Sequence, residues 1–341
     1  MLACVIHGAH DLRVEAVEEQ PIGPDDAEVA IAVGGICGSD LSYFQKGAVG
    51  DFVVREPMVL GHEVVGTVAR TGADVDSRLV GQRVAINPGK TCGVCGPCRA
   101  GKSNVCESVV FLGSAARFPH VQGGFRERLV IGASQLVPLP DGLSFESAVF
   151  AEPLAVASHA VHRSGEVRGR RLLVVGAGPV GSLVTLVARH RGCADITVTD
   201  LFDGPLQTAR RAGATRTVNV SSGSEELGTA DVVFEASGSP AGLATALQSV
   251  GRGGTVVQLG LLPAGLISVP GNLIVAKDLD VRGSFRFTAA EFDEAVTLLA
   301  GGLDVAPFVS ARMDILAAGE AFTLASNRAA SVKVQLTIGE R

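Results

Sequence analysis

Four cysteines near position 100 have the residue type and spacing of a metal site. They form the pattern C-x-x-C-x-x-C-x7-C and are Cys92, Cys95, Cys98 and Cys106. Glycine and proline residues between them allow one loop to wrap around an ion. Four thiolates that leave no coordination position open are typical of structural zinc, which orders a loop and takes no part in chemistry. An iron–sulfur centre and unrelated thiols are the alternatives, and the spacing favours zinc.

A second stretch, in the middle of the chain, has the pattern of a nucleotide site. The apolar run Leu172–Val175 predicts a short strand buried on both faces. The pattern G-x-G-x-x-G follows directly and contains Gly176, Gly178, Pro179, Val180 and Gly181. Glycines there let the backbone turn tightly and approach a pyrophosphate, which binds at the N-terminus of the following helix. An ordinary turn is the alternative in a chain this rich in glycine, so the motif needs support from its surroundings.

The next predicted strand gives that support. The run Ile196–Val198 is again apolar and is followed by Thr199 and Asp200. An acidic residue at this point hydrogen-bonds the ribose hydroxyls of a dinucleotide. The same carboxylate repels the 2′-phosphate of NADP, and Asp203 adds to that repulsion. The sequence therefore predicts NAD as the cofactor rather than NADP.

Length, charge and cysteine content limit the class of protein. The chain has 341 residues, a formal net charge of −6 and 7 cysteines. The length suggests two domains, and the charge gives no general attraction to nucleic acid or to an anionic membrane. No apolar run is long enough to span a bilayer, and the first residues lack the pattern of a signal peptide. Clustered cysteines favour metal binding over disulfides, so we expect a cytoplasmic protein. The charge and the lack of a long apolar run lead us to expect no nucleic-acid or membrane partner.

The order of the predicted strands and helices indicates which elements position these stretches. Up to about residue 140, short strands separated by turns are typical of a β-barrel, with strands expected at Val29–Val33, Glu63–Ala69 and Arg83–Ile86. From Val149 onward, apolar strands alternate with segments of helical length. That alternation is typical of a doubly wound parallel sheet.

The last part of the chain returns to mixed structure. Helices are expected near Glu291–Ala300 and Ala317–Ala325, and an alternating apolar strand follows from Val332 to Ile338. Such a strand most simply rejoins the first domain, which makes the nucleotide domain an insertion. The expected domains are residues 1–148 plus 285–341 and residues 149–284, with the ligand site in the cleft between them.

Two further stretches contain ligand-type residues: GGICGSDL, with Cys37, and PMVLGHEVVG, with His62. Together with the four-cysteine loop, FAEPLAVASHA, VVGAGPVG and RGSFRF, they are very specific. Over nearly its full length the chain resembles the zinc-dependent medium-chain alcohol and polyol dehydrogenases. The resemblance implies an α/β protein in which a GroES-like β-barrel catalytic domain carries an inserted, doubly wound Rossmann domain. It also implies NAD and two zinc ions per chain, one structural and one catalytic.

The resemblance further implies roles for individual residues. Cys37 and His62 would hold the catalytic zinc, and Glu63 or Glu152 would complete its shell, directly or through water. The sequence does not rank these two carboxylates. The zinc would act as a Lewis acid on a substrate hydroxyl, and hydride would pass to the nicotinamide.

Other residues would guide the proton and the substrate. Ser39, which lies two residues after Cys37, is the first candidate for a proton path to solvent. Ser42 stands where many relatives have a histidine, so a histidine relay at that position is excluded. Tyr43 and Phe111 would contact the substrate, and Arg286 would bind a carboxylate with its forked guanidinium. The stretches EPMVLGHE, RVAINP, FLGSAARFPHVQGGF and VRGSFRFT resemble the branch of the family that oxidises the sugar acid L-idonate to 5-keto-D-gluconate.

Alternatives stay open within and outside this family. A sorbitol- or xylitol-type polyol dehydrogenase and an L-threonine dehydrogenase would have the same architecture. A nucleotide-binding protein without catalysis is the alternative of another class, and it predicts the loss of Cys37, His62 or Glu152, all of which are present. Relatives are commonly homodimers or homotetramers, so we expect one of these assemblies here.

Overall fold

The computed structural model describes residues 1–223 and 226–339 and divides into two compact units. The first comprises residues 1–152, 292–327 and the segment from Lys333 onward, and the second comprises residues 153–291 and 328–332. Both boundaries lie later in the chain than the expected ones, because helices α4 (Ala151–Ser164) and α9 (Ala289–Ala300) each span a boundary. Residues 224–225 and 340–341 of the expected domains lie outside the described residues.

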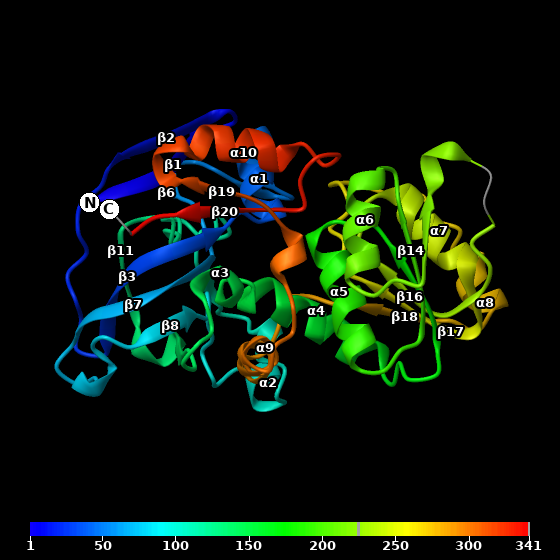
Figure 1. The fold of residues 1–341 in the computed structure, drawn as a ribbon, viewed down its shortest axis with the longest axis horizontal. Helices are drawn as coiled ribbons and strands as arrows, with labels where there is room; N and C mark the ends of the chain where they lie inside the picture. Colours follow the sequence, from blue (N-terminus) through cyan, green and yellow to red (C-terminus); the bar gives the residue numbers. More distant parts are fainter. Residues whose placement is uncertain (224–225, 340–341) are drawn as a thin grey trace. The chain divides into compact units, whose positions relative to one another are not determined.

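A seven-stranded sheet forms the centre of the first unit (Figure 1). Its strands follow the order β12-β8-β7-β3-β20-β19, and β11 also pairs with β3. Neighbours are antiparallel except β19 and β20, which run parallel. The strands are β3 (Asp26–Gly35), β7 (Glu63–Thr71), β8 (Arg83–Ile86), β11 (Arg128–Gly132), β12 (Leu136–Pro138), β19 (Val309–Asp314) and β20 (Lys333–Thr337).

Shorter elements complete the first unit. A second sheet has the order β2-β1-β6, and two strand pairs, β4–β5 and β9–β10, form hairpin-like ladders. The strands are β1 (Leu2–Gly8), β2 (Asp11–Ala16), β4 (Ala48–Val49), β5 (Phe52–Val53), β6 (Met58–Val59), β9 (Gly89–Lys90) and β10 (Val110–Phe111). The helices are α1 (Gly38–Lys46), α2 (Gly96–Arg99), α3 (Phe145–Ala148) and α10 (Ala318–Ser326).

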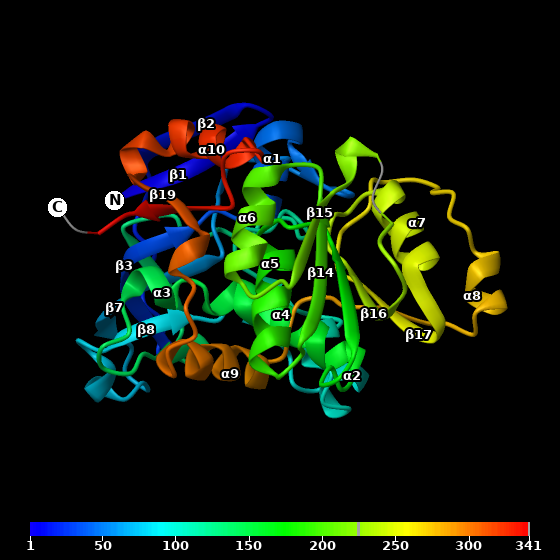
Figure 2. The ribbon, with the colours of Figure 1, turned by 45° about the vertical axis from the view of Figure 1, so that its right-hand side comes forward.

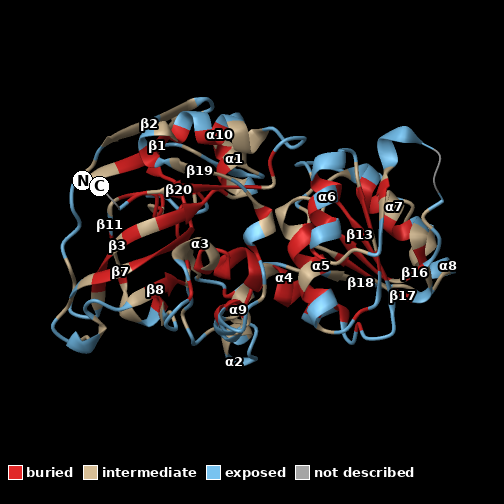
Figure 3. Cartoon of the chain, in the orientation of Figure 1, coloured by how far each residue is buried: buried red, intermediate tan, exposed pale blue. Residues whose placement is uncertain are grey.

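The core of the first unit lies along β3, β7 and β20, where buried residues follow one another (Figure 3). In β3, the alternating residues Val29, Ile31 and Val33 are all buried, as the sequence predicts for a core-facing strand. In β20, by contrast, the polar residues Lys333 and Gln335 are as buried as the apolar residues between them. Both faces of this strand are therefore covered, and its two edges pair with β3 and β19.

A six-stranded parallel sheet forms the centre of the second unit, in the order β15-β14-β13-β16-β17-β18. Figure 2 shows α5 and α6 on one face of this sheet and α7 on the other. The predicted doubly wound sheet is therefore confirmed. Its elements are β13 (Arg171–Val175), α5 (Pro179–His190), β14 (Asp195–Asp200), α6 (Asp203–Arg211), β15 (Arg216–Asn219), β16 (Ala230–Glu235), α7 (Pro240–Ser249), β17 (Val250–Gln258), α8 (Asn272–Ala276) and β18 (Asp280–Gly283).

The predicted return of the last strand to the first unit is also confirmed, because β20 pairs with β3 and β19. The helix α1, which begins directly after Cys37, was not among the elements expected from the sequence. Among the described residues, no helix combines the length and the apolar composition that crossing a bilayer requires.

Candidate metal centres and nucleotide site

Two chain segments meet at Cys37 and His62, and a carboxylate joins them. Cys37 directly precedes α1, and His62 directly precedes β7. Asp40 Oδ2 accepts a hydrogen bond from Cys37 N at 3.0 Å, and Asp40 Oδ1 accepts one from Gly61 N at 3.2 Å. Asp40 Oδ1 also lies 3.8 Å from His62 Nδ1. The fully buried Asp40 therefore fixes both segments and faces the imidazole, although the sequence analysis did not single it out.

Two glycines make room for the site. Gly61 has φ +96°, and a Cβ there would lie 2.2 Å from the ring of Phe125. Gly35 pairs with Glu63 across β3 and β7, and a Cβ at Gly35 would lie 2.2 Å from Glu63 Oε2. A side chain at either position would displace the backbone before His62 or the carboxylate of Glu63.

Cys37, His62 and Glu63 form one group of ligand atoms. The thiol sulfur, a ring nitrogen and a carboxylate oxygen all lie within 4.8 Å of one another. The carboxylate of Glu63 also accepts two hydrogen bonds from Lys333 Nζ, at 2.8 and 2.7 Å. The structure thus brings the predicted residues Cys37, His62 and Glu63 close to one another. It also places Lys333 beside them, although no sequence motif pointed to this residue. The sequence gives no signal for Lys333, because it alternates with apolar residues in the same way as the polar residues Gln335 and Thr337.

Electrostatics indicate that this group is suited to a cation. Burial, with a further contribution from the charge of Glu63, raises the pKa of the Cys37 thiol to about 12. Burial also raises the pKa of Glu152 to about 8, and the negative charges of Glu63 and Cys37 add to that rise. The site thus contains three buried acidic groups, Cys37, Glu63 and Glu152. Lys333 is a cation that pairs with only one of them, Glu63. Thiolate, imidazole and carboxylate are the ligands of catalytic zinc, so the donor set fits this ion.

Glu152 lies in the first turn of α4 and is buried. The charges of His62, Glu63, Cys37 and Lys333 all act on its carboxyl group, so it faces the same site. It is outside the group of ligand atoms that lie within 4.8 Å of one another. The sequence left open whether Glu63 or Glu152 is the carboxylate ligand. In the structure, Glu63 is bound to Lys333, and Glu152 lies outside the group of ligand atoms.

Two of the predicted substrate residues lie in the same unit as this group. The ring of Phe111, in β10, has its centroid 5.6 Å from that of His62. Tyr43, in α1, is buried, and its hydroxyl oxygen accepts a hydrogen bond from Ala115 N at 2.9 Å. Tyr43 thereby holds the loop that follows β10. Ser39 lies in the first turn of α1 and is partly exposed, and its role in proton transfer stays a prediction.

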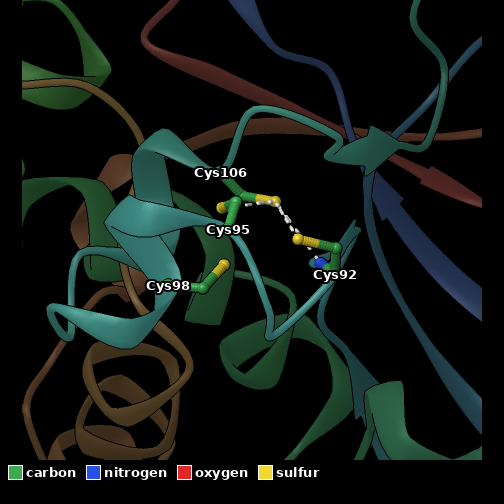
Figure 4. A group of neighbouring side chains, drawn as sticks. All are labelled: Cys92, Cys95, Cys98 and Cys106. Carbon is green, nitrogen blue, oxygen red and sulfur yellow. Dashed lines mark hydrogen bonds between the residues drawn. The ribbon is translucent and has the colours of Figure 1, made fainter.

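The four-cysteine loop is a second candidate metal centre. The sulfur atoms of its cysteines point toward one another (Figure 4) and all lie within 4.8 Å of one another. Hydrogen bonds from the N–H groups of Val94 and Cys95 lower the pKa of Cys92 to about 6, whereas burial and the neighbouring thiols raise the pKa of Cys98 to about 12. Adjacent thiols show such opposite shifts when one ionises first, and a cation lets all of them ionise. Four sulfur ligands fit a closed zinc site.

The glycine turn after β13 is built for close approach of a ligand. Gly176 has φ +101°, and a Cβ on Gly181 would lie 1.9 Å from Gly176 O, so both positions require glycine. A Cβ on Gly178, which precedes Pro179 at the start of α5, would have no neighbour within 4 Å. The N-terminus of α5 is therefore open on this side, as binding of a pyrophosphate requires.

Asp200 lies at the carboxyl end of β14, as predicted. Its Oδ2 accepts a hydrogen bond from Ala177 N at 2.7 Å, and its Oδ1 accepts bonds from Leu201 N and Phe202 N at 2.7 and 3.1 Å. The carboxylate thus joins the glycine turn to the end of the next strand and keeps acceptor capacity on Oδ2 for a ribose hydroxyl. Arg286 lies in the same unit, with its guanidinium 4.7 Å from the ring centre of Phe285, and its contact with a substrate stays a prediction.

Two parts of the chain match known protein families. Residues 23–141 match the family described as alcohol dehydrogenase GroES-like domain, and residues 179–301 match the family described as zinc-binding dehydrogenase. The chain is 40% identical to L-idonate 5-dehydrogenase (NAD(P)(+)) of Escherichia coli (strain K12), over 98% of each chain. It is 36% identical to sorbitol dehydrogenase of Bacillus subtilis (strain 168), over 89% of this chain and 87% of that one.

Solved structures agree with these matches. The crystal structure of L-idonate 5-dehydrogenase from Escherichia coli K-12 substrain MG1655 superimposes with a TM-score of 0.92 and 39% sequence identity. The superposition covers 99% of this chain and 98% of the other. The fold class expected from the motifs, a GroES-like domain with a Rossmann-type parallel sheet, is confirmed.

Removal of one sulfur ligand tests the second metal centre. We expect the substitution Cys95→Ser to reduce the zinc content from about two ions to about one per chain, because three thiolates hold the ion far less tightly than four. The melting temperature should fall by roughly 5–10 °C, since the loop loses its cross-link. Zinc is measured by atomic emission and unfolding by calorimetry.

Cys193→Ser is the matched control, because Cys193 is a buried cysteine of the second unit, whereas the candidate ligands of both metal centres belong to the first. It should leave the zinc content unchanged. An unchanged zinc content in Cys95→Ser would contradict the assignment of this loop as a zinc site.

Proposed function

The chain belongs to the zinc-binding family of alcohol dehydrogenases, and we propose that it oxidises the sugar acid L-idonate to 5-keto-D-gluconate with NAD as the hydride acceptor. The proposal is carried by the buried group of Cys37, His62 and Glu63 in a chain that is 40% identical, over nearly its whole length, to an L-idonate 5-dehydrogenase. The sorbitol dehydrogenase relative supports the broader class of polyol dehydrogenase.

We assign the catalytic zinc to Cys37 and His62, with a carboxylate of Glu63 or Glu152 completing its shell. Zinc bound there supplies a Lewis acid that lowers the pKa of a substrate hydroxyl. The protein contributes a rigid frame, because Asp40 holds the chain on both sides of the site. The four-cysteine loop takes a second, structural zinc, and Ser39 is the candidate that passes the hydroxyl proton to solvent.

The nucleotide is assigned to the second unit. The glycine turn and the N-terminus of α5 would bind the pyrophosphate, and Asp200 would bind the ribose hydroxyls. The network of backbone N–H groups on Asp200 holds its carboxylate in place. Its negative charge favours NAD over NADP. A nucleotide-binding protein without catalysis is disfavoured, since Cys37, His62 and Glu63 are grouped as ligands.

We further propose a homodimer or homotetramer in the cytoplasm. The edge strand β18 and the segments before and after it carry exposed apolar side chains, namely Leu261, Leu266, Val269, Val275, Val281 and Phe285. Two copies of β18 paired antiparallel about Val281 would place Asp280 of one copy opposite Arg282 of the other, which matches opposite charges. Free thiols at all seven cysteines suit a reducing compartment.

A substrate panel tests the reaction. We expect kcat/KM with NAD to be about 10–100-fold higher for L-idonate than for sorbitol, xylitol or L-threonine, because a carboxylate–arginine pair adds roughly 1.5–3 kcal/mol of binding. Arg286→Met should lower the value for L-idonate and leave that for sorbitol unchanged. Initial rates across the panel, with D-gluconate included, are the measurement. Strong turnover of sorbitol or xylitol with none of L-idonate would reassign the substrate.

The cofactor preference depends on the charge of Asp200. We expect the unmodified protein to prefer NAD, and Asp200→Asn to lower kcat/KM for NAD by about tenfold while the value for NADP stays level or rises. Asp195→Asn, at the opposite end of the same strand, is the matched control and should change neither value. A preference of the unmodified protein for NADP would remove the role given to Asp200.

The assembly is tested by light scattering. We expect a mass of two or four chains, and Val281→Asp should shift the protein toward monomers because it places a charge at the centre of the proposed contact. Val220→Asp, at an exposed position after the opposite edge strand β15, should leave the mass unchanged. A monomeric unmodified protein at micromolar concentration would refute the proposed assembly.

A further inference from the structure

Helix α4 presents two histidines, one turn apart, to a single carboxylate at the start of α9. His159 Nδ1 lies 2.9 and 3.0 Å from Oε1 and Oε2 of Glu291, and His162 Nδ1 lies 2.9 Å from Oε1. All three residues belong to the second unit, and His159 and Glu291 are buried. This cluster shares no residue with the candidate metal centres or with the glycine turn.

The partners of the cluster determine where its hydrogen atoms lie. His162 Nε2 lies against Nη2 of Arg191, and a guanidinium only donates, so His162 is neutral and carries its hydrogen on Nδ1. Burial raises the pKa of Glu291, but hydrogen bonds from His159 and His162 outweigh that effect and hold the pKa well below its usual value. The ionised carboxylate therefore accepts from both imidazoles, which fixes it to α4.

The same carboxylate fixes the residue that precedes α9. Residues 288–291 have the capping-box pattern T-x-x-E. Glu291 Oε2 accepts hydrogen bonds from Thr288 N at 2.7 Å and from Thr288 Oγ1 at 2.9 Å, and Thr288 Oγ1 accepts one from Glu291 N at 3.3 Å. Thr288 comes only two residues after Arg286. Glu291 thus holds one end of the segment that carries Arg286.

Helix α4 also holds the other end of this segment. Arg163 donates a hydrogen bond from Nε to the backbone oxygen of Gly283, the last residue of β18, at 3.1 Å. Between the two anchors, Arg286 has φ +54°, in the left-handed region that residues other than glycine rarely adopt. Such strained residues persist only where the surrounding structure enforces them, and they cluster at ligand-binding sites. The segment 283–288 is therefore held at both ends around a strained arginine.

We propose that Glu291 is a positioning residue that, together with His159 and His162, holds Arg286 in the geometry that binds the carboxylate of a sugar-acid substrate. This inference rests on the role proposed above for Arg286. A guanidinium forms two parallel hydrogen bonds with a carboxylate only in one relative orientation, so a fixed backbone strengthens the pair. An uncharged polyol has no group that makes this pair. The cluster therefore sets the affinity for sugar acids and not the rate of hydride transfer.

Loss of one hydrogen-bond donor tests this role. In His159→Leu, we expect KM for L-idonate to rise about 10-fold while kcat changes less than about threefold, because binding is weakened and the chemical step is not. KM for sorbitol should stay within about twofold of its original value. His159→Asn is the matched variant, because its side-chain amide still donates to the carboxylate, and it should keep KM close to that of the unmodified protein. Initial rates with NAD give both parameters.

A double-variant cycle separates positioning from a purely structural role. Glu291→Ala should raise KM for L-idonate about 10–30-fold, but less than about twofold in the Arg286→Met background, where no guanidinium is left to position. His159→Leu gives the same cycle if Glu291→Ala does not fold. Asp231→Asn removes a carboxylate that pairs with Arg171 in the second unit, and it should leave KM unchanged. Equal effects in both backgrounds, or equal rises of KM for L-idonate and sorbitol, would overturn the inference.

Hydrogen exchange tests the anchor without any substrate. In Glu291→Ala, the backbone N–H of Thr288 loses its acceptor, so we expect it to exchange about 10-fold faster, whereas N–H groups in β13 should keep their rates. Mass spectrometry of peptides that cover residues 283–291 is the measurement. An unchanged exchange rate would refute the anchor whatever the substrate is. Turnover of sorbitol with none of L-idonate would instead refute the proposed function, and with it the role of Arg286.

Discussion

A cluster of acidic groups that is buried beside a single lysine is the constraint on which the first unit depends. Cys37, Glu63 and Glu152 are acidic groups held away from water, and Lys333 neutralises one of them. Burial favours the protonated forms of Cys37 and Glu152, and a bound metal ion would stabilise their ionised forms. The sheet, the two glycines and the buried lysine bring segments that are far apart in the chain together at this cluster.

Carboxylates also organise the backbone at both proposed sites. Asp40 accepts bonds from the N–H groups of Cys37 and Gly61, and Asp200 accepts bonds from three N–H groups around the glycine turn. In each case, one side chain satisfies the donors of irregular segments that sheets and helices leave unpaired. At each proposed site, a carboxylate that binds backbone N–H groups therefore holds the neighbouring segments in place.

A similar tie holds the helices that connect the units. Oε1 of Glu291, in α9, lies 2.9 Å from the Nδ1 atoms of both His159 and His162, in α4. Both helices span a boundary between the two units, which explains why those boundaries differ from the ones expected from composition alone. A change from strand-rich to helix-rich sequence marks a domain only roughly when one helix belongs to both.

The sequence by itself determined the features that depend on spacing along the chain. The C-x-x-C-x-x-C-x7-C pattern, the glycine turn followed by Asp200, and the alternation of strands and helices are local, so they predicted a four-sulfur cluster and a doubly wound sheet. Tertiary structure alone decided the features that join distant residues. Asp40 and Lys333 carry no local signal, because the first acts on a segment 21 residues away and the second on a carboxylate 270 residues away. The pairing of Glu63 with Lys333 depends on β20 lying beside β3 in the sheet, which no spacing along the chain encodes.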